Sequence, residues 1–542
     1  MTSRKHVEGM KRAIPPVAIH EYALKSWLLA TWAERWSVDR LRSKTESGLL
    51  ASCEILYNWV MSKIKIASFA IFVLSLLLIF FLPHADNDFG WHLRCGQDLF
   101  NGNLCIKNHY SYFLPDFKWA YSSFLYDALV AIIFSLNGFL GLSIVGAFIS
   151  ASTILLAFFT NRGPFIARIS LCYLAIFFSW SVLSLGFRSQ FLTMFFVALF
   201  IFILKRVREP KQIIIIPLMI IWTNSHAGFF LGPVLVLFFF LSKLFLEGSR
   251  KSLFSFSLFL STIIATLVNP FFWRVWVEVL RHATRGLENS IAEWVPTIFP
   301  HSLFVIIFAV VISLFYTVKY LKSHKTSAFE ILTIIFFAIL ALKARRNLPI
   351  FYLSIIALFP MDLPKLNRIL EHPQIKITTC SIIVFLIVLS TPGNIYKVVN
   401  FSTNWGVYCE TGYVRLPCKA TEFAKDFRGN IFNMYEWGGF LDWKIPNSKV
   451  FIDGRMPAWQ SEKGKNSYQA WLEILQAQDS WNTKLEVLQT NYIFVSIGTF
   501  IDLEMKDDPE KYGYQEIYRN DGTVIYKRIL PPTKIFFPSS ST

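Results

Sequence analysis

A series of apolar segments separated by short polar ones restricts the fold of this chain more than any other sequence feature. A helix needs roughly 20 apolar residues to cross the hydrocarbon core of a bilayer. Because lipid offers no hydrogen-bond partners to the backbone, such segments are expected to be helical. We predict about eleven crossings, near Ile64–Leu82, Leu140–Thr160, Pro164–Leu185, Ser189–Leu204, Ile213–Trp222, Gly228–Leu241, Leu253–Val268, Ser302–Val318, Ala328–Leu342, Leu348–Phe359 and Ile375–Leu389.

The composition supports a multi-pass membrane protein with the lipid bilayer as its first partner. Hydrophobic residues make up 54% of the chain and charged residues 16%, with a mean hydropathy of +0.45. These values exclude an ordinary soluble protein. The net charge of +17 would suit a nucleic-acid partner, but no basic stripe with interleaved aromatics stands apart from the apolar segments. We therefore expect no nucleic-acid partner.

The distribution of lysine and arginine predicts the orientation. Loops on the cytoplasmic side of a membrane carry an excess of basic residues. With a cytoplasmic N-terminus, the predicted inner loops include the sequences KRVREPK, GSRK, KYLKSHK and LPKLNR. This predicts three parts: a cytoplasmic segment 1–63, a transmembrane domain 64–392 with a large external loop 84–127, and an extracytoplasmic domain 393–542. The expected location is the plasma or inner membrane.

The final 150 residues or so are expected to form a small α/β domain. Strand-like runs occur at Asn430–Asn433, Lys449–Asp453, Tyr492–Ser496, Tyr514–Tyr518 and Thr523–Lys527, with a helical stretch near Tyr468–Gln489. Gly438–Gly439 is expected to allow a tight backbone turn. Asp453 and Arg455 follow a strand, and the ends of strands in open α/β sheets are where sites form.

The cysteines leave two possibilities open. Cys95 with Cys105, and Cys409 with Cys418, fall in segments predicted to be external, so each pair could form a disulfide. Free thiols suit the same spacing equally well.

The external loop 84–127 contains the most chemically varied stretch of the chain. Asp86 and Asp88 form a D-x-D, which can hold a divalent cation such as Mg²⁺ or Mn²⁺, or offer one carboxylate as a base. If Asp88 starts a helix, His92 lies one turn later on the same face. A solvated loop whose acids only cap helices is the simpler interpretation of this motif taken alone.

The other external polar groups make a chemical interpretation possible. Interiors of the predicted spans hold few ionisable residues, whereas Arg188, His226, Arg345 and Arg346 all fall on the external side. Sugar transfer from a lipid-linked phosphate needs one base for the acceptor hydroxyl. It also needs Arg, Lys or a metal to stabilise the leaving phosphate. Asp86 or Asp88 could serve as the base or metal ligand, and the arginines as phosphate ligands.

An ordered series of motifs gives the chain a resemblance to the GT-C superfamily of integral-membrane glycosyltransferases, and more narrowly to a group of bacterial multi-pass proteins of that type. The matching residues, between about 64 and 530, are Asp86, Asp88, Trp91, His92, Leu93, Arg94 and Gly96, Trp119 to Leu125, Arg188 and Gln190, Asn224 to Gly228, Asn269, Pro270, Trp273 and Arg274, Glu293 and Trp294, Ala344 to Arg346, Trp437 to Gly439, and Phe451 to Arg455. Gly90 departs from the pattern, since an aromatic residue is usual there.

The resemblance implies a GT-C-like fold and a polyprenyl-phosphate or pyrophosphate sugar donor, with a glycan, lipid or protein as acceptor. It implies that Asp86, Asp88 and His92 are catalytic, with Asp86 and Asp88 as the metal ligands if a cation is used. Residues expected to bind substrate are Arg94, Arg188, His226, Arg345, Arg346, Asp453 and Arg455.

Two other functions suit the same sequence. A transporter or flippase of lipid-linked glycans predicts a polar path through the spans. A GT-C-fold assembly protein without catalytic activity predicts that Asp86 and Asp88 can be replaced without loss.

Overall fold

The computed structural model describes Lys63 and residues 66–83, 86–115, 117–284, 291–323, 328–360, 415–460 and 466–529, together with Ser381, residues 392–393 and 395–399, and Cys409. The contacts divide the chain into two compact units, Met1–Phe72 and Val73–Thr542. The predicted crossing at Ile375–Leu389 and nearly all of segment 1–63 lie outside the described residues. The fold and site below belong to Val73–Thr542.

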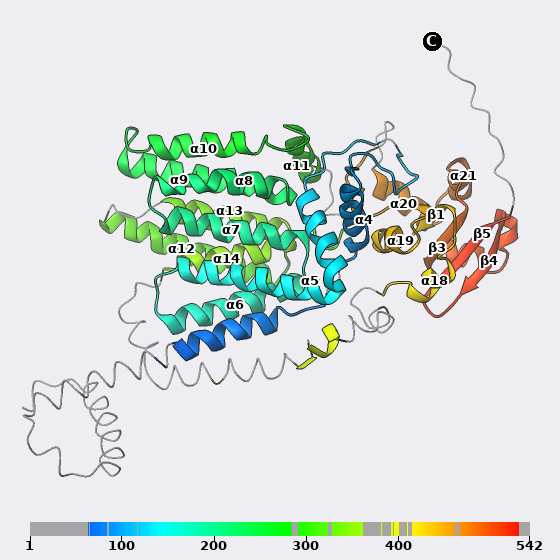
Figure 1. Ribbon diagram of the computed structural model, residues 1–542, viewed down its shortest axis with the longest axis horizontal. Helices are drawn as coiled ribbons and strands as arrows, with labels where there is room; N and C mark the ends of the chain where they lie inside the picture. Colours follow the sequence, from blue (N-terminus) through cyan, green and yellow to red (C-terminus); the bar gives the residue numbers. More distant parts are fainter. Residues whose placement is uncertain are drawn as a thin grey trace, which may run out of the picture. The chain divides into compact units, whose positions relative to one another are not determined.

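Helices account for the first part of this unit (Figure 1). Their bounds are α4 Phe89–Phe100, α5 Phe124–Thr160, α6 Phe165–Leu183, α7 Ser189–Arg206, η3 Lys211–Ile214, α8 Ile215–Thr223, η4 Ala227–Phe230, α9 Leu231–Glu247, α10 Leu253–Ala265, α11 Arg274–Thr284, α12 His301–Ser323, α13 Ala328–Lys343, η6 Arg345–Asn347 and α14 Leu348–Leu358.

Five helical segments of the described chain are long and apolar enough to cross a membrane: Phe124–Thr160, Phe165–Leu183, Ser189–Arg206, Ala227–Glu247 and His301–Lys322. The structure thus supports a mostly helical protein with several candidate membrane spans. Helices also occupy the other predicted spans that are described. Some are short: α8, with nine residues, is only about 14 Å long. The number of about eleven crossings stays a prediction.

The apolar stretch at the end of the first loop is continuous with the predicted span Leu140–Thr160. Both form α5, which contains non-helical angles at Asn137 and Gly138. Gly138 has a φ of +55°, which favours glycine. The kink therefore separates a first segment that packs on α4 from a second that packs among the spans.

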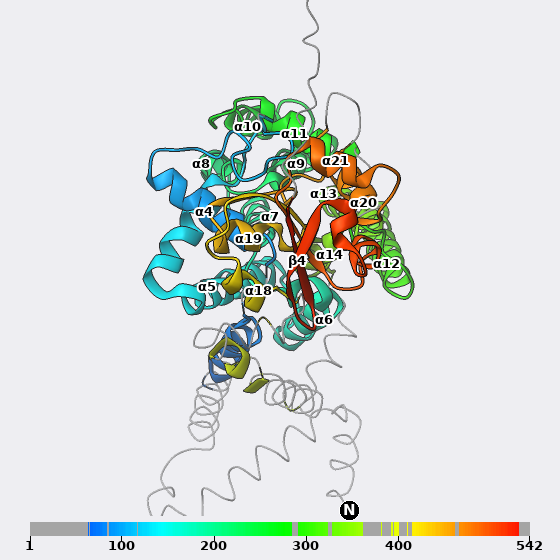
Figure 2. The same cartoon turned by 90° about the vertical axis from the view of Figure 1, so that its right-hand side faces the viewer.

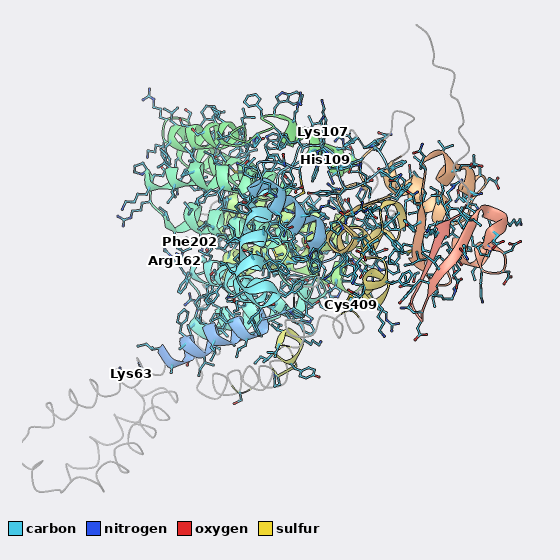
Figure 3. The ribbon with its side chains drawn as sticks, turned by 45° about the vertical axis from the view of Figure 1, so that its right-hand side comes forward. Lys63, Lys107, His109, Arg162, Phe202 and Cys409 are labelled. Atoms are coloured by element: carbon cyan, nitrogen blue, oxygen red, sulfur yellow. A yellow bond between two sulfur atoms is a disulfide. The ribbon has the colours of Figure 1, made fainter. Side chains whose placement is uncertain are left out.

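Basic residues and the first loop lie toward opposite ends of the helices. Helix α7 begins after Arg188 and ends with Lys205 and Arg206. Figure 3 shows Lys107 and His109 of the first loop away from Arg162, which follows the C-terminus of α5. This matches the alternation of polar and basic loops predicted from the sequence.

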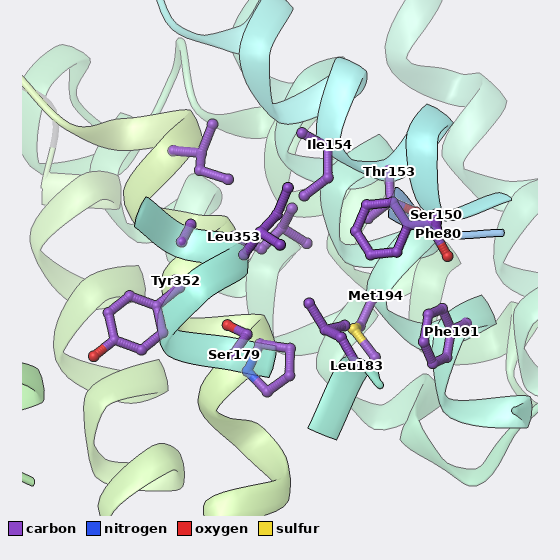
Figure 4. A pocket seen from close by; sticks show the side chains of 14 residues that line it. Phe80, Ser150, Thr153, Ile154, Ser179, Leu183, Phe191, Met194, Tyr352 and Leu353 are labelled. Atoms are coloured by element: carbon purple, nitrogen blue, oxygen red, sulfur yellow. The ribbon is translucent and has the colours of Figure 1, made fainter. Parts of the chain in front are cut away.

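A small cavity lies among α5, α6, α7 and α14 (Figure 4). Ile154, Ile176, Met194 and Leu353 are among the apolar side chains that line it, and its volume is about 30 Å³. The transporter alternative predicts a polar path through the spans, and this cavity is lined mostly by apolar side chains, with the hydroxyls of Ser150, Thr153 and Ser179 among them.

The C-terminal part is an α/β layer, as the sequence predicted. Its sheet has the order β2-β1-β3-β5-β4, in which β1 pairs in parallel with β2 and β3, whereas β5 is antiparallel to β3 and β4. The bounds are α18 Cys418–Phe423, β1 Gly429–Asn433, η7 Tyr435–Trp437, α19 Gly438–Lys444, β2 Ser448–Val450, α20 Ser467–Leu475, α21 Trp481–Val487, β3 Tyr492–Ser496, α22 Phe500–Met505, η8 Pro509–Tyr512, β4 Tyr514–Arg519 and β5 Thr523–Arg528.

The helical stretch predicted near Tyr468–Gln489 is present as two helices, α20 and α21. One local prediction in this domain was wrong. Gly438 and Gly439 do not form a turn but begin α19. A Cβ on Gly438 would lie 2.2 Å from the carbonyl oxygen of Ile452. These glycines therefore permit close packing of the backbone rather than a change in its direction.

The first loop attaches the helices to the sheet. Tyr112 N–H donates to the Val450 carbonyl at 3.1 Å, and Val450 N–H donates to the Tyr110 carbonyl at 3.0 Å. Helix α4 packs on α19. The two backbones approach so closely at Gly90 that a Cβ there would lie 1.6 Å from the Gly439 carbonyl oxygen. Figure 1 shows α4 and α19 between the sheet and the ends of the helices, and Figure 2 shows α4 and α19 side by side.

Both cysteine pairs left open by the sequence are bonded in the structure: Cys95 to Cys105, and Cys409 to Cys418. The first joins α4 to the loop segment that reaches β2. This bond limits the movement of the loop on which the candidate site is built.

Candidate active site

The D-x-D motif lies at the start of α4. Asp88 is the N-cap residue, and its side chain makes no capping hydrogen bond. The backbone N–H of His92 donates to the Asp88 carbonyl at 3.2 Å, so His92 lies one turn later, as predicted. Because the Asp88 carboxylate is not used to cap the helix, it is available for another interaction.

Arg188, which precedes α7, connects two carboxylates from distant parts of the chain. Its Nε donates to Asp86 Oδ1 at 3.1 Å, and its Nη1 donates to Glu293 Oε1. Burial would lower the pKa of Arg188, but Asp86 and Glu293 outweigh this and raise it. Burial raises the pKa of Glu293, but the charges of Arg188 and Arg346 outweigh burial, so the pKa of Glu293 is lowered. The three groups therefore form a charged network.

Arg346 joins this network from η6. Its guanidinium lies 4.6 Å from the ring centroid of Trp294, and its backbone N–H donates to the Glu293 carbonyl. In the amide orientation that the donors require, the Gln190 oxygen accepts from Arg346 Nε at 3.0 Å. The adjacent Arg345 is exposed. From the sequence, both arginines were expected to bind substrate. In the structure, Arg346 lies among Glu293, Trp294 and Gln190, whereas Arg345 is exposed.

Asp88 differs from Asp86 and Glu293 because it forms no ion pair with any described residue. Burial, followed by repulsion from Asp86, raises its pKa to about 6, although Arg188 and His92 lower it. The indole N–H of Trp91 also lowers the pKa, and it has no hydrogen-bond partner among the described residues. The result is a half-buried carboxyl group that titrates near neutral pH.

His92 is buried and forms a pair with Asp127. Its Nδ1 lies 2.5 Å from Asp127 Oδ1, and Asp127 also accepts from the Tyr121 hydroxyl. Burial lowers the pKa of His92, but Asp127 more than reverses this and raises it. The sequence gave Asp127 no role. A carboxylate at the start of an apolar helix was the signal that could have identified it.

His226 is held in one tautomer. Its Nδ1 accepts from Gly228 N–H at 3.0 Å and from the Thr193 hydroxyl at 2.8 Å. Because Nδ1 accepts from the Gly228 N–H, the Thr193 hydroxyl must donate to it, and Thr193 Oγ1 accepts in turn from Trp222 Nε1. The ring proton is therefore on Nε2. Burial, and then the charge of Arg346, lowers the pKa of His226 to about 3, so the ring is neutral at physiological pH.

The C-terminal domain contributes residues that follow parallel strands. A Cβ on Gly454, after β2, would lie 1.7 Å from Asp88 Oδ1, so this backbone turn touches the carboxylate. Tyr435 follows β1. Burial raises its pKa well above the usual value, as do Asp88 and Glu293. The phenol of Tyr435 thus interacts electrostatically with both acids, and the sequence gave no sign of this beyond the position of Tyr435 after a strand.

Three residues predicted to bind substrate, Arg94, Asp453 and Arg455, have partners within the protein. Arg94 donates to the carbonyls of Asp442 at 3.1 Å and Pro446 at 3.0 Å, which ties α4 to α19. Asp453 and Arg455 form an ion pair with no exposed side-chain surface. The Arg455 guanidinium lies within 6.0 Å of the ring centroids of Trp91, Tyr110, Trp119 and Trp459. Arg455 therefore connects α4, the first loop and the C-terminal domain.

Comparisons with known proteins support the fold. No protein-family model and no protein of curated function matches the sequence. The structure is similar to the oligosaccharyltransferase AglB from Archaeoglobus fulgidus in complex with an inhibitory peptide and a dolichol-phosphate, with a TM-score of 0.51 and 12% identity over 88% of this chain and 75% of that one. It is equally similar to the same enzyme tethered to an acceptor peptide containing the NVT sequon, with the same coverage, identity and score.

These neighbours have the GT-C fold of membrane enzymes, so the resemblance noted in the sequence is confirmed at the level of fold. A third structure, of that oligosaccharyltransferase with Zn and sulfate, has a TM-score of 0.48 and 12% identity over 84% of this chain and 73% of that one.

Proposed function

We propose that this protein is a membrane glycosyltransferase that moves a sugar from a polyprenyl-phosphate or pyrophosphate donor to an extracytoplasmic glycan, lipid or protein acceptor. One observation carries the proposal. Asp88, a carboxylate without an ion pair among the described residues, lies beside two half-buried arginines, Arg188 and Arg346, whose charges act on it. A base beside fixed positive charge is what transfer from a lipid phosphate requires.

The proposed reaction balances with the groups present. A hydroxyl or amide of the acceptor loses its proton to the Asp88 carboxylate as its oxygen or nitrogen bonds to the anomeric carbon. The bond from that carbon to the phosphate oxygen breaks, and the electron pair leaves with the phosphate. Arg346 and the Nε2–H of His226 stabilise the negative charge that develops. The pair of His92 and Asp127 is proposed to hold the first turn of α4 in place, and with it Asp88 at the N-terminus of this helix.

The other predicted residues have supporting roles in this proposal. Asp86 and Glu293 hold Arg188 in place, whereas Arg94, Asp453 and Arg455 keep the sheet against the first loop. Exposed Arg345 is proposed to contact the lipid-linked phosphate as it approaches from the membrane. The C-terminal domain would then lie on the extracytoplasmic side and the N-terminus in the cytoplasm.

The proposal is tested with purified protein in detergent and a panel of radiolabelled polyprenyl-phosphate sugars. We expect label to move from at least one donor to an acceptor. If no donor is used, and variants at Asp86 and Asp88 still complement a deletion strain, the assembly-protein alternative replaces the enzyme. If the unaltered donor instead crosses the bilayer of reconstituted vesicles, the flippase alternative is favoured.

The activity of this enzyme should depend on pH through Asp88. The carboxylate is the active form, and its pKa of about 6 is above the ordinary value of 3.8. We therefore expect kcat/KM to fall about tenfold for each unit of pH below 6 and to be constant above about pH 7. A profile without an inflection between pH 5 and 7 would contradict the assignment of Asp88 as the base.

His226 should bind the donor phosphate as a neutral hydrogen-bond donor. Loss of a hydrogen bond to a charged group costs about 1.5–3 kcal/mol, so His226→Leu should weaken donor binding about 10- to 100-fold. His226→Gln, which also places an N–H there, should restore part of it. Because the pKa of His226 is about 3, the loss should be the same at pH 6 and pH 8. A loss confined to the lower pH would show a charged histidine instead.

A further inference from the structure

Arg188 lies between two acidic side chains that come from separate segments, one before α4 and one between α11 and α12. Its guanidinium donates through Nε to Asp86 Oδ1 at 3.1 Å and through Nη1 to Glu293 Oε1. The Arg188 side chain is 14% exposed and that of Asp86 is 2% exposed. One largely buried cation is therefore shared by the two carboxylates.

The Asp86 and Glu293 oxygens that accept from Arg188 are already occupied and cannot also bind a divalent cation. Mg²⁺ requires near-octahedral oxygen ligands at about 2.0–2.1 Å. Asp86 Oδ1 already accepts from Arg188 and from the Asp88 backbone N–H, at 3.2 Å. Glu293 Oε1 is occupied by Arg188 as well. Within the part of the chain that the structure describes, no three His, Cys, Asp or Glu side chains are grouped as a metal site.

The energetics favour the guanidinium over an added metal ion. An ion bound by Asp86 and Glu293 would have to displace Arg188 and leave its buried charge without a partner, which is strongly unfavourable. Arg346, whose guanidinium interacts with Glu293 as well, would add to the repulsion of a second cation. The site thus already holds fixed positive charge where a metal would otherwise supply it.

We propose that Arg188 takes the place of a divalent cation in this protein, so that Asp86 and Glu293 hold an arginine rather than a metal. The chemical meaning of this assignment rests on the proposed function, because the fixed charge would stabilise the departing phosphate. A metal-independent transferase follows from it. Asp86 then positions Arg188, and of the two D-x-D carboxylates only Asp88 is left to act as the base.

Binding of Mn²⁺ alone, measured by electron paramagnetic resonance on the full chain in detergent, tests the assignment without any assay of activity. The wild type should show no saturable site at micromolar Mn²⁺. Arg188→Ala, which leaves Asp86 and Glu293 without their cation, should gain one site, and adding Asp86→Asn should remove it. Arg345→Ala removes an exposed arginine from the same end of the helices and should behave as the wild type.

Three outcomes would overturn the assignment. The first is a micromolar Mn²⁺ site in the wild type that Asp86→Asn abolishes, and this measurement decides even if Arg188→Ala does not fold. The second is a folded Arg188→Ala variant that gains no site. The third is a wild-type transferase inactivated by EDTA and restored by Mn²⁺.

The proposed function can fail separately. If the wild type transfers no sugar but the variants bind Mn²⁺ as expected, the proposed function fails and the assignment of Arg188 stands.

Discussion

Asp88→Asn should lower the rate of sugar transfer about 10²- to 10⁴-fold, the range expected for loss of a general base. Asparagine has nearly the same shape, so the close contact with Gly454 is preserved. The amide cannot accept the proton of the acceptor. Donor binding depends on the arginines and should change little. Single-turnover kinetics with a labelled donor, together with a donor-binding titration, measure the two effects separately.

Asp98→Asn is the matched control, because Asp98 is on the same helix and contacts Tyr110 rather than the arginine network. It should keep most of the activity. Asp86→Asn should weaken donor binding as well as turnover, since it releases Arg188 from one of its two acids. If Asp88→Asn turned over at the wild-type rate and Asp86→Asn did not, Asp86 would be the base. If both variants were fully active, the catalytic interpretation would be wrong.

Gly90→Ala should both destabilise the protein and inactivate it. The new Cβ would lie 1.6 Å from the Gly439 carbonyl oxygen and 2.6 Å from its carbon. Both are backbone atoms, so α4 and α19 must move apart. Overpacking costs typically about 1–3 kcal/mol, and contact with backbone places this change at the upper end. Because Asp88 is at the N-terminus of the same helix, activity should fall more than stability alone explains. Thermal unfolding in detergent and the transfer assay measure the two effects.

Gly522→Ala provides the control for Gly90→Ala. A Cβ at Gly522 meets no heavy atom within 4 Å, so we expect an unchanged melting temperature and unchanged transfer. A Gly90→Ala variant that melts and turns over like the wild type would show that α4 and α19 are not in close backbone contact.

The departure at Gly90 illustrates what one sequence can and cannot reveal. The sequence showed glycine where proteins of similar pattern carry an aromatic residue, without a reason for it. The reason is a backbone contact with Gly439, which is more than 300 residues away. A contact between such distant segments has no local signal.

The membrane class, the helix positions and the sheet strands could be predicted from local pattern. Apolar length predicted α6, α7 and α9 to within a few residues, except at the C-terminus of α9, because a helix in lipid is recognisable from hydrophobicity alone. β-branched and aromatic runs bounded by polar residues identified β1, β3, β4 and β5. The turn predicted at Gly438 was wrong because glycine serves close packing as well as tight turns.

The site was only partly predictable. The sequence alone placed five ionisable groups outside the apolar spans: Asp86, Asp88, Arg188, His226 and Arg346. Because His92 follows Asp88 by four residues, the period of a helix predicted that both lie on one face. Only the tertiary structure distinguished the two aspartates. Arg188, about 100 residues further along the chain, pairs with Asp86 and leaves Asp88 with a raised pKa. Charge and burial act through space, so the role of each carboxylate depends on the neighbours that folding brings to it.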